Sequence, residues 1–144
     1  MLFPDEFYKK SKCSQKERET LMPLFEKIIQ LTKQVKQEGL LALEDRLEEL
    51  PDIFMKHLLQ LAIDGIELET IRHSGMIMIS SGNYQGIELL RRMMVLDWII
   101  YLCDFDQYDH EIIGELIGVY LGASLFERYL EKLEKEAKEK LKKR

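Results

Sequence analysis

Apolar residues in this chain recur at intervals of three and four, the spacing of one face of an α-helix. Between Leu24 and Val35 they occupy positions 24, 28, 31 and 35, and the same spacing returns from Phe126 to Leu141. Only the tetrapeptide at 76–79, Met-Ile-Met-Ile, could be read as a short strand. Few helix breakers interrupt the pattern, since the 144 residues include 8 glycines and 3 prolines. We therefore predict an all-α fold, a single-domain bundle of about five helices with a long C-terminal helix.

Proline, glycine and capping residues divide this pattern into segments. Pro23 fits the first turn of a helix, and the residue before Pro51 avoids helical dihedrals. Asp64-Gly65 is typical of a helix end, because glycine readily adopts the left-handed conformation found there. Asp109 is a suitable N-cap for the last helix. The predicted helices span residues 20–50, 51–64, 67–79, 85–103 and 109–141. The single domain then divides into an N-terminal segment at 1–19, helices at 20–82 and a C-terminal helical pair at 83–144.

Composition narrows the classes of protein to consider. The chain is 46% hydrophobic and 33% charged, as in soluble globular proteins, and its net charge of −5 argues against nucleic acid as a partner. The longest apolar run, 112–126, contains Glu115 and is shorter than the roughly 20 residues that a membrane span needs. We expect a cytoplasmic protein without membrane insertion. Two cysteines are too few for a disulfide framework.

No residue pattern points to catalysis. The three histidines fall in different predicted segments, and neither Cys13 nor Cys103 lies in a metal-binding, redox or nucleophile motif. Nucleotide-binding and hydrolase fingerprints are also missing from the sequence. We therefore expect no metal site, no cofactor and no enzymatic activity.

One glycine lies inside the first predicted helix, in the segment Glu38–Glu44, E-G-L-L-A-L-E. Glycine there costs about 1 kcal/mol relative to alanine. We therefore expect Gly39 to lie under a close helix crossing, with Leu40, Leu43 and Leu47 facing the core. Gly65, in contrast, is expected to end its helix.

Asp97 interrupts the apolar run at 93–100. A buried carboxylate needs a partner, and an arginine or lysine from another helix would supply one. The alternative is that Asp97 is a functional contact charge.

Glycine recurs at every fourth position of the last predicted helix, at Gly114, Gly118 and Gly122. We expect this face to pack against another helix of the same chain, most readily the second or fourth, while a dimer seam is the alternative. The apolar stripe that follows, from Phe126 to Leu141, should either fold back on the N-terminal cluster of Leu2, Phe3 and Phe7 or form a coiled coil with a second copy.

The segment Lys36–Glu44, K-Q-E-G-L-L-A-L-E, resembles the cytoplasmic part of MotA-type flagellar stator proteins. In that family a helix carries the pattern R-x-x-G-hydrophobic-x-x-L-E and continues to an Asp-Gly helix end, which Gln60–Gly65 matches here. The family's two rotor-facing charges fall on Lys36 and Glu44. The first is usually arginine, so lysine keeps the charge but loses the planar fork.

A later stretch, from Arg92–Ile100 to Leu116, is similar to the family's cytoplasmic tail, with Trp98 where glycine is typical. In the family, membrane helices separate the two cytoplasmic parts, whereas this chain has only the stretch around 75–86 between them. The chain therefore looks like the two cytoplasmic pieces joined together.

The resemblance implies a non-enzymatic protein, cytoplasmic and peripheral to the flagellar motor, that contacts rotor or stator components. Lys36 and Glu44 are then expected to be exposed on one helix, with Arg72, Arg91 and Arg92 as further surface candidates. The alternative is a general helical scaffold or adaptor that self-associates through its last helix and has no connection with motility.

Overall fold

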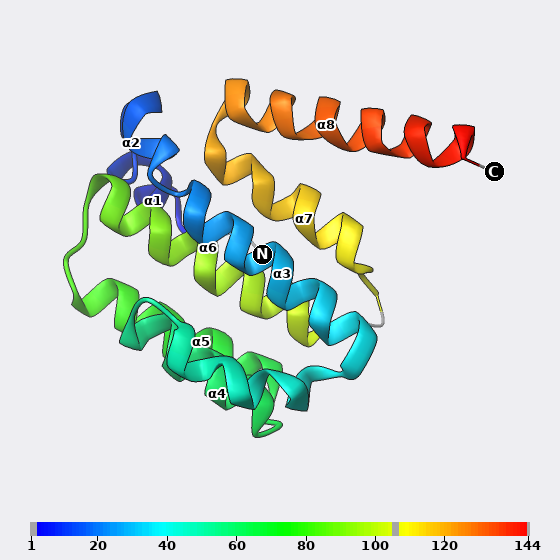
Figure 1. Ribbon diagram of the computed structural model, residues 1–144. Coiled ribbons are helices and arrows are strands. Elements are labelled where there is room, and N and C mark those ends of the chain that lie inside the picture. Colours follow the sequence, from blue (N-terminus) through cyan, green and yellow to red (C-terminus); the bar gives the residue numbers. More distant parts are fainter. Residues whose placement is uncertain (1–2, 105–106, 144) are drawn as a thin grey trace.

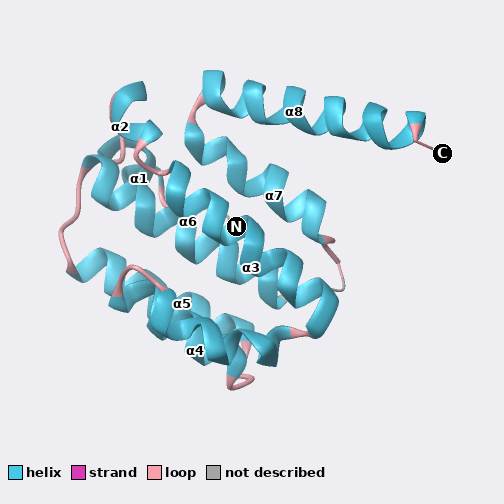
Figure 2. Cartoon of the chain, viewed as in Figure 1, coloured by secondary structure: helices cyan, strands magenta, loops and turns pink. Residues whose placement is uncertain are grey.

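The computed structural model describes residues 3–104 and 107–143, and every regular element in these ranges is a helix (Figures 1 and 2). The α-helical fold predicted from the sequence is confirmed, but the described residues form eight α-helices rather than about five. Two 3₁₀ segments, η1 and η2, add to them. In chain order the elements are α1 (Asp5–Lys10), α2 (Gln15–Glu19), α3 (Met22–Glu38), η1 (Leu40–Glu49), α4 (Ile53–Ile63), α5 (Leu68–Ser81), α6 (Gly86–Cys103), α7 (His110–Gly118), η2 (Val119–Leu121) and α8 (Ala123–Lys142).

Several helix ends follow the predicted signals. Pro23 lies in the first turn of α3, and the Asp109 side chain caps α7 by accepting from the backbone N–H of Ile112 at 2.9 Å. Gly65 follows α4 with φ +76°, the left-handed conformation expected of it. These local signals therefore located their helix ends correctly.

The helix predicted over 20–50 is broken at Gly39. This residue has φ +88° and ψ 167°, dihedrals that only glycine adopts readily, and the chain continues as η1 instead of an α-helix. A Cβ added to Gly39 would meet no atom within 4 Å, so the predicted close helix crossing is wrong. Glycine is required by the backbone turn and not by packing. Leu43 and Leu47 are buried and Leu40 packs against the core, as predicted.

The long C-terminal helix predicted over 109–141 is also broken, at Gly122. The chain passes from α7 through η2, turns at Gly122 with φ +87° and ψ 162°, and returns as α8 across α7 (Figure 1). The apolar spacing runs through this turn, so the sequence periodicity does not show the reversal. Within the part of the chain that is described, no helix combines the length and apolar character needed to cross a bilayer.

The glycine face of α7 packs within the chain, as predicted, although α3 and α8 provide the atoms that approach it. A Cβ on Gly114 would lie 2.7 Å from the Tyr129 hydroxyl and 2.9 Å from Ile29, and one on Gly118 would lie 3.0 Å from Phe126. α7 also packs against α6, the fourth predicted helix. The small residues thus let α8 lie close to α7.

α6 runs through the core and is buried along most of its length. The Trp98 indole N–H donates to the Thr32 hydroxyl at 2.9 Å, and that hydroxyl donates to the Ile28 carbonyl at 2.6 Å. Where α5 crosses α6, a Cβ on Gly75 would lie 2.5 Å from Leu96. The close glycine crossing that was expected at Gly39 therefore occurs at Gly75.

The C-terminal stripe does not fold back on the N-terminal cluster. Phe3 and Phe7 belong to the core that includes α6, whereas α8 has no buried residue and Leu141 is 67% exposed. Leu2 lies outside the described residues. The second half of α8 consequently projects past the body of the bundle (Figure 1).

Candidate protein-contact surfaces

η1 is held against α3 by apolar and charged contacts. Lys27 on α3 donates to Glu49 at 2.9 Å, Arg46 also pairs with Glu49, and Arg46 donates to Gln34 on α3 at 2.7 Å. The hydrogen bonds from Lys27 and then Arg46 lower the pKa of the Glu49 carboxyl below its usual value. One side of η1 is thereby fixed, and its opposite side is left to solvent.

Lys36 and Glu44 are both exposed and lie on two elements that pack together, α3 and η1. The prediction that they share one helix is wrong, because Gly39 separates them with its left-handed turn. Neither side chain forms an ion pair within residues 3–104 and 107–143. Both charges are therefore available to a partner, although their relative direction differs from that in a continuous helix.

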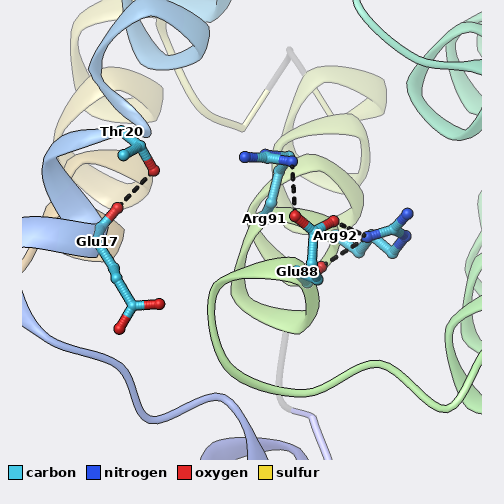
Figure 3. A network of polar contacts seen from close by, with 5 residues as sticks. All are labelled: Glu17, Thr20, Glu88, Arg91 and Arg92. Atoms are coloured by element: carbon cyan, nitrogen blue, oxygen red, sulfur yellow. Dashed lines mark hydrogen bonds and ion pairs between the residues drawn. The ribbon is translucent and has the colours of Figure 1, made fainter.

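The other three predicted contact residues are already engaged by glutamates of their own helices. Arg91 and Arg92 share Glu88 on α6, at 3.3 Å and 3.1 Å (Figure 3), while Arg72 on α5 lies 3.6 Å from Glu69.

Arg92 has two further contacts. Its guanidinium donates to the Glu88 carbonyl at 2.8 Å and stacks 3.6 Å from the centre of the Tyr84 ring. These contacts hold the Arg92 side chain against Glu88 and Tyr84.

The five predicted contact residues lie on four different elements. η1 packs on α3 and α4, whereas the three arginines lie on α5 and α6. Lys36 and Glu44 therefore stand apart as the exposed charged pair.

Asp97 is buried and accepts a hydrogen bond from the Tyr120 hydroxyl at 2.8 Å. Burial raises the pKa of its carboxyl, against the hydrogen bond from Tyr120 and the charge of Arg72. The charge of Arg72, on another helix, has a smaller effect on that pKa than the Tyr120 hydroxyl, whose hydrogen bond to Asp97 no sequence pattern indicated. Burial and the neighbouring Asp97 also raise the pKa of Tyr120. The pair joins α6 to η2 and is not an exposed contact charge.

Two side chains that sequence reasoning missed connect α2 to η2. Gln15 donates to the Leu121 carbonyl at 3.0 Å, and Arg18 donates to the Tyr120 carbonyl at 2.8 Å. Both carbonyls come immediately before the Gly122 turn. Because the helix ends there, neither carbonyl has the backbone N–H donor that a continuing α-helix would provide. The only sequence signal for such contacts is a glycine that ends a helix, here Gly122. The apolar spacing continues past Gly122 and therefore favoured an unbroken helix.

A shallow groove of about 460 Å³ lies between the start of α4 and the end of α5, with Tyr84 and Arg92 in its lining. It is open to solvent. Across the described part of the chain, no three His, Cys, Asp or Glu side chains are grouped so that they could hold a metal ion.

Comparison with known proteins gives these surfaces a context. No family model matches the sequence, and no solved structure matches it. Over 145 aligned positions the chain is 27% identical to motility protein A of Bacillus subtilis (strain 168), covering 86% of this chain and 53% of that protein. The chain therefore spans about half the length of this curated relative. It is similar to a motility protein over most of its own length.

Proposed function

We propose that this protein is a MotA-like motility protein that acts by contact with protein components of the flagellar motor and not by catalysis. The observation that carries the proposal is the similarity to motility protein A, which extends over 86% of the chain. It agrees with the resemblance of Lys36–Glu44 to the stator helix. A cytoplasmic position beside the motor is part of the same proposal.

Lys36 and Glu44 are the residues that we expect to make the contact. Each is exposed and lacks an ion-pair partner among the residues that the structure describes, so binding breaks no internal contact. The two elements that carry them pack together, since Leu43 and Leu47 of η1 are buried and Lys27 of α3 pairs with Glu49. A rigid pair of opposite charges favours a partner surface with the reverse arrangement.

The test is direct binding of the purified protein to purified rotor and stator components of the organism that encodes it. Glu44→Lys should weaken binding by about threefold to tenfold, as expected for an exposed interface charge. The difference should shrink as salt rises, because salt screens exposed charges.

Glu26→Lys is the matched control, since Glu26 is an exposed glutamate on α3 and the charge change is the same. Absence of binding to every motor component would refute the proposal. Equal effects of the two substitutions would remove Glu44 from the contact.

A helical scaffold without a role in motility is the second candidate. One observation favours it: α8 has no buried residue and projects from the bundle. A scaffold would self-associate and bind no motor component, so the same experiment separates the two functions.

A further inference from the structure

The three most exposed large apolar side chains among the described residues lie in two regions of opposite charge. They are Ile53 at 81%, Leu41 at 70% and Leu141 at 67% exposed. Leu41 lies near the start of η1, and Ile53 is the first residue of α4, after the turn that follows η1. Leu141 stands near the end of α8. Single exposed apolar side chains are common on protein surfaces, so the charges around them carry the argument.

The region around η1 is strongly acidic. Residues 38–52, which we call the acidic segment, contain six acidic residues and one arginine. Glu44, Asp45 and Glu48 are exposed, in contrast to the buried Leu43 and Leu47 beside them.

The end of α8 carries the opposite charge. Residues 135–143, which we call the basic end, contain five lysines and two glutamates, and all of them are exposed. The acidic segment and the basic end are therefore complementary in charge, and each presents apolar side chains at its surface.

The bundle of the same chain does not cover the basic end. α8 has 20 residues and is about 30 Å long, whereas α7 and η2 together have 12 residues and reach about 20 Å. Phe126 and Tyr129, in the first two turns of α8, pack on the glycine face of α7. Beyond them α8 outreaches its support: Leu133 is half-buried, and Ala137 and Leu141 are exposed.

We propose that a second copy of this chain binds here, with the basic end of α8 in one copy docked on the acidic segment of the other. Each chain carries both surfaces, so a twofold axis makes the contact twice and leaves neither surface open. Leu141 then packs beside Leu41 and Ile53 of the other copy, and the surrounding lysines face Glu44, Asp45 and Glu48. This dimer does not depend on the proposed motility function, but it occupies Glu44 and therefore competes with the motor contact proposed for that residue.

Analytical ultracentrifugation of the full chain with paired charge reversals tests the dimer. Lys138→Glu with Lys142→Glu leaves the basic end with more acidic than basic residues, and Asp45→Lys with Glu48→Lys reverses two of the three exposed acidic charges that face it. Each double variant alone should dimerise at least about tenfold more weakly than the unmodified chain, because like charges then meet. An equimolar mixture of the two double variants should recover a dimer. In the mixed dimer, one contact has opposite charges because both of its sides are reversed, and the other contact keeps its original charges.

Lys9→Glu with Lys12→Glu is the matched control, because both lysines are exposed and lie outside the two surfaces. This variant should dimerise like the unmodified chain. Circular dichroism verifies that each variant remains helical. The dimer of the unmodified chain should also weaken as salt rises, which tests the same charges without a substitution.

Three results would overturn the inference. The first is a monomer at every concentration up to the solubility limit. The second is a mixture of the two double variants that fails to recover a dimer. The third is a dimer that tolerates both reversals but is lost in Leu133→Glu, because that result would identify a coiled coil of two α8 helices instead.

Discussion

Gly39 and Gly122 adopt nearly the same backbone conformation in different surroundings, which allows strain to be separated from packing. Their φ and ψ are +88° and 167°, and +87° and 162°. Substitution by alanine should cost about 1–3 kcal/mol at each position for the backbone alone. At Gly39 nothing lies within 4 Å of the new Cβ, so this is the whole expected cost.

At Gly122 the new Cβ would also lie 2.5 Å from the Gln15 side-chain oxygen and 2.9 Å from Arg18. Both side chains must move, and each donates to a carbonyl just before the turn. A neutral hydrogen bond contributes about 0.5–1.5 kcal/mol and one from a charged group about 1.5–3 kcal/mol. Because both bonds are partly exposed, we expect Gly122→Ala to be less stable than Gly39→Ala by about 2 kcal/mol.

Urea denaturation followed by far-ultraviolet circular dichroism measures the two unfolding free energies under the same conditions. In a Gln15→Ala, Arg18→Ala background the extra cost of Gly122→Ala should largely vanish, because the groups that it displaces are gone. Equal destabilisation of the two glycine variants in the unmodified background would refute the reasoning.

Three further substitutions test the core. Gly75→Ala should lower stability by about 1–3 kcal/mol in urea denaturation, because the new methyl group overpacks against Leu96 at the crossing of α5 and α6. Thr32→Val should cost about 1–3 kcal/mol and shift the tryptophan fluorescence, since the buried Trp98 N–H loses its acceptor; an unchanged stability would contradict the hydrogen bond. Burial raises the pKa of Asp97 above its usual 3.8, so the unfolded chain releases this proton first and stability falls as pH rises from about 4. Asp97→Asn removes that loss. The unfolding free energy of the variant minus that of the unmodified chain should therefore increase with pH, as measured by denaturation between about pH 3 and 7.

The sequence was sufficient for the helical class and for much of the core. The spacing of Leu24, Ile28, Leu31 and Val35 predicted one buried face of α3, and all four residues are buried. Helix ends with a chemical signature were also predictable, because a cap such as Asp109 acts through neighbouring residues alone.

The two reversals of the chain were not predictable by the same reasoning. Gly39 and Gly122 each interrupt an apolar stripe whose spacing continues beyond them, so periodicity favours one long helix in both places. In the described residues a positive φ is marked by glycine or, at residue 83, by asparagine, and Gly75 shows that a glycine can equally serve a helix crossing. Which use applies depends on tertiary contacts.

The candidate surface was predictable in part for a related reason. The exposure of Lys36 and Glu44 follows from their places between apolar positions, but their separation onto two elements depends on the turn at Gly39. The ion pairs of Arg91 and Arg92 with Glu88 lie three and four residues apart on one helix and could have been read from the sequence. The contacts of Gln15 and Arg18 join residues more than a hundred positions apart and could not.

Those two long-range contacts have a consequence for how the protein is made. Arg18 and Gln15 leave the ribosome long before the carbonyls that they bind, which are 102 and 106 positions later in the chain. During synthesis α2 must wait until η2 has emerged, and contacts of such large sequence separation form late. A nascent chain that stalls before η2 should therefore keep α2 open to proteases. Protection of the N-terminal segment should appear only once the whole α7–η2 turn has left the exit tunnel.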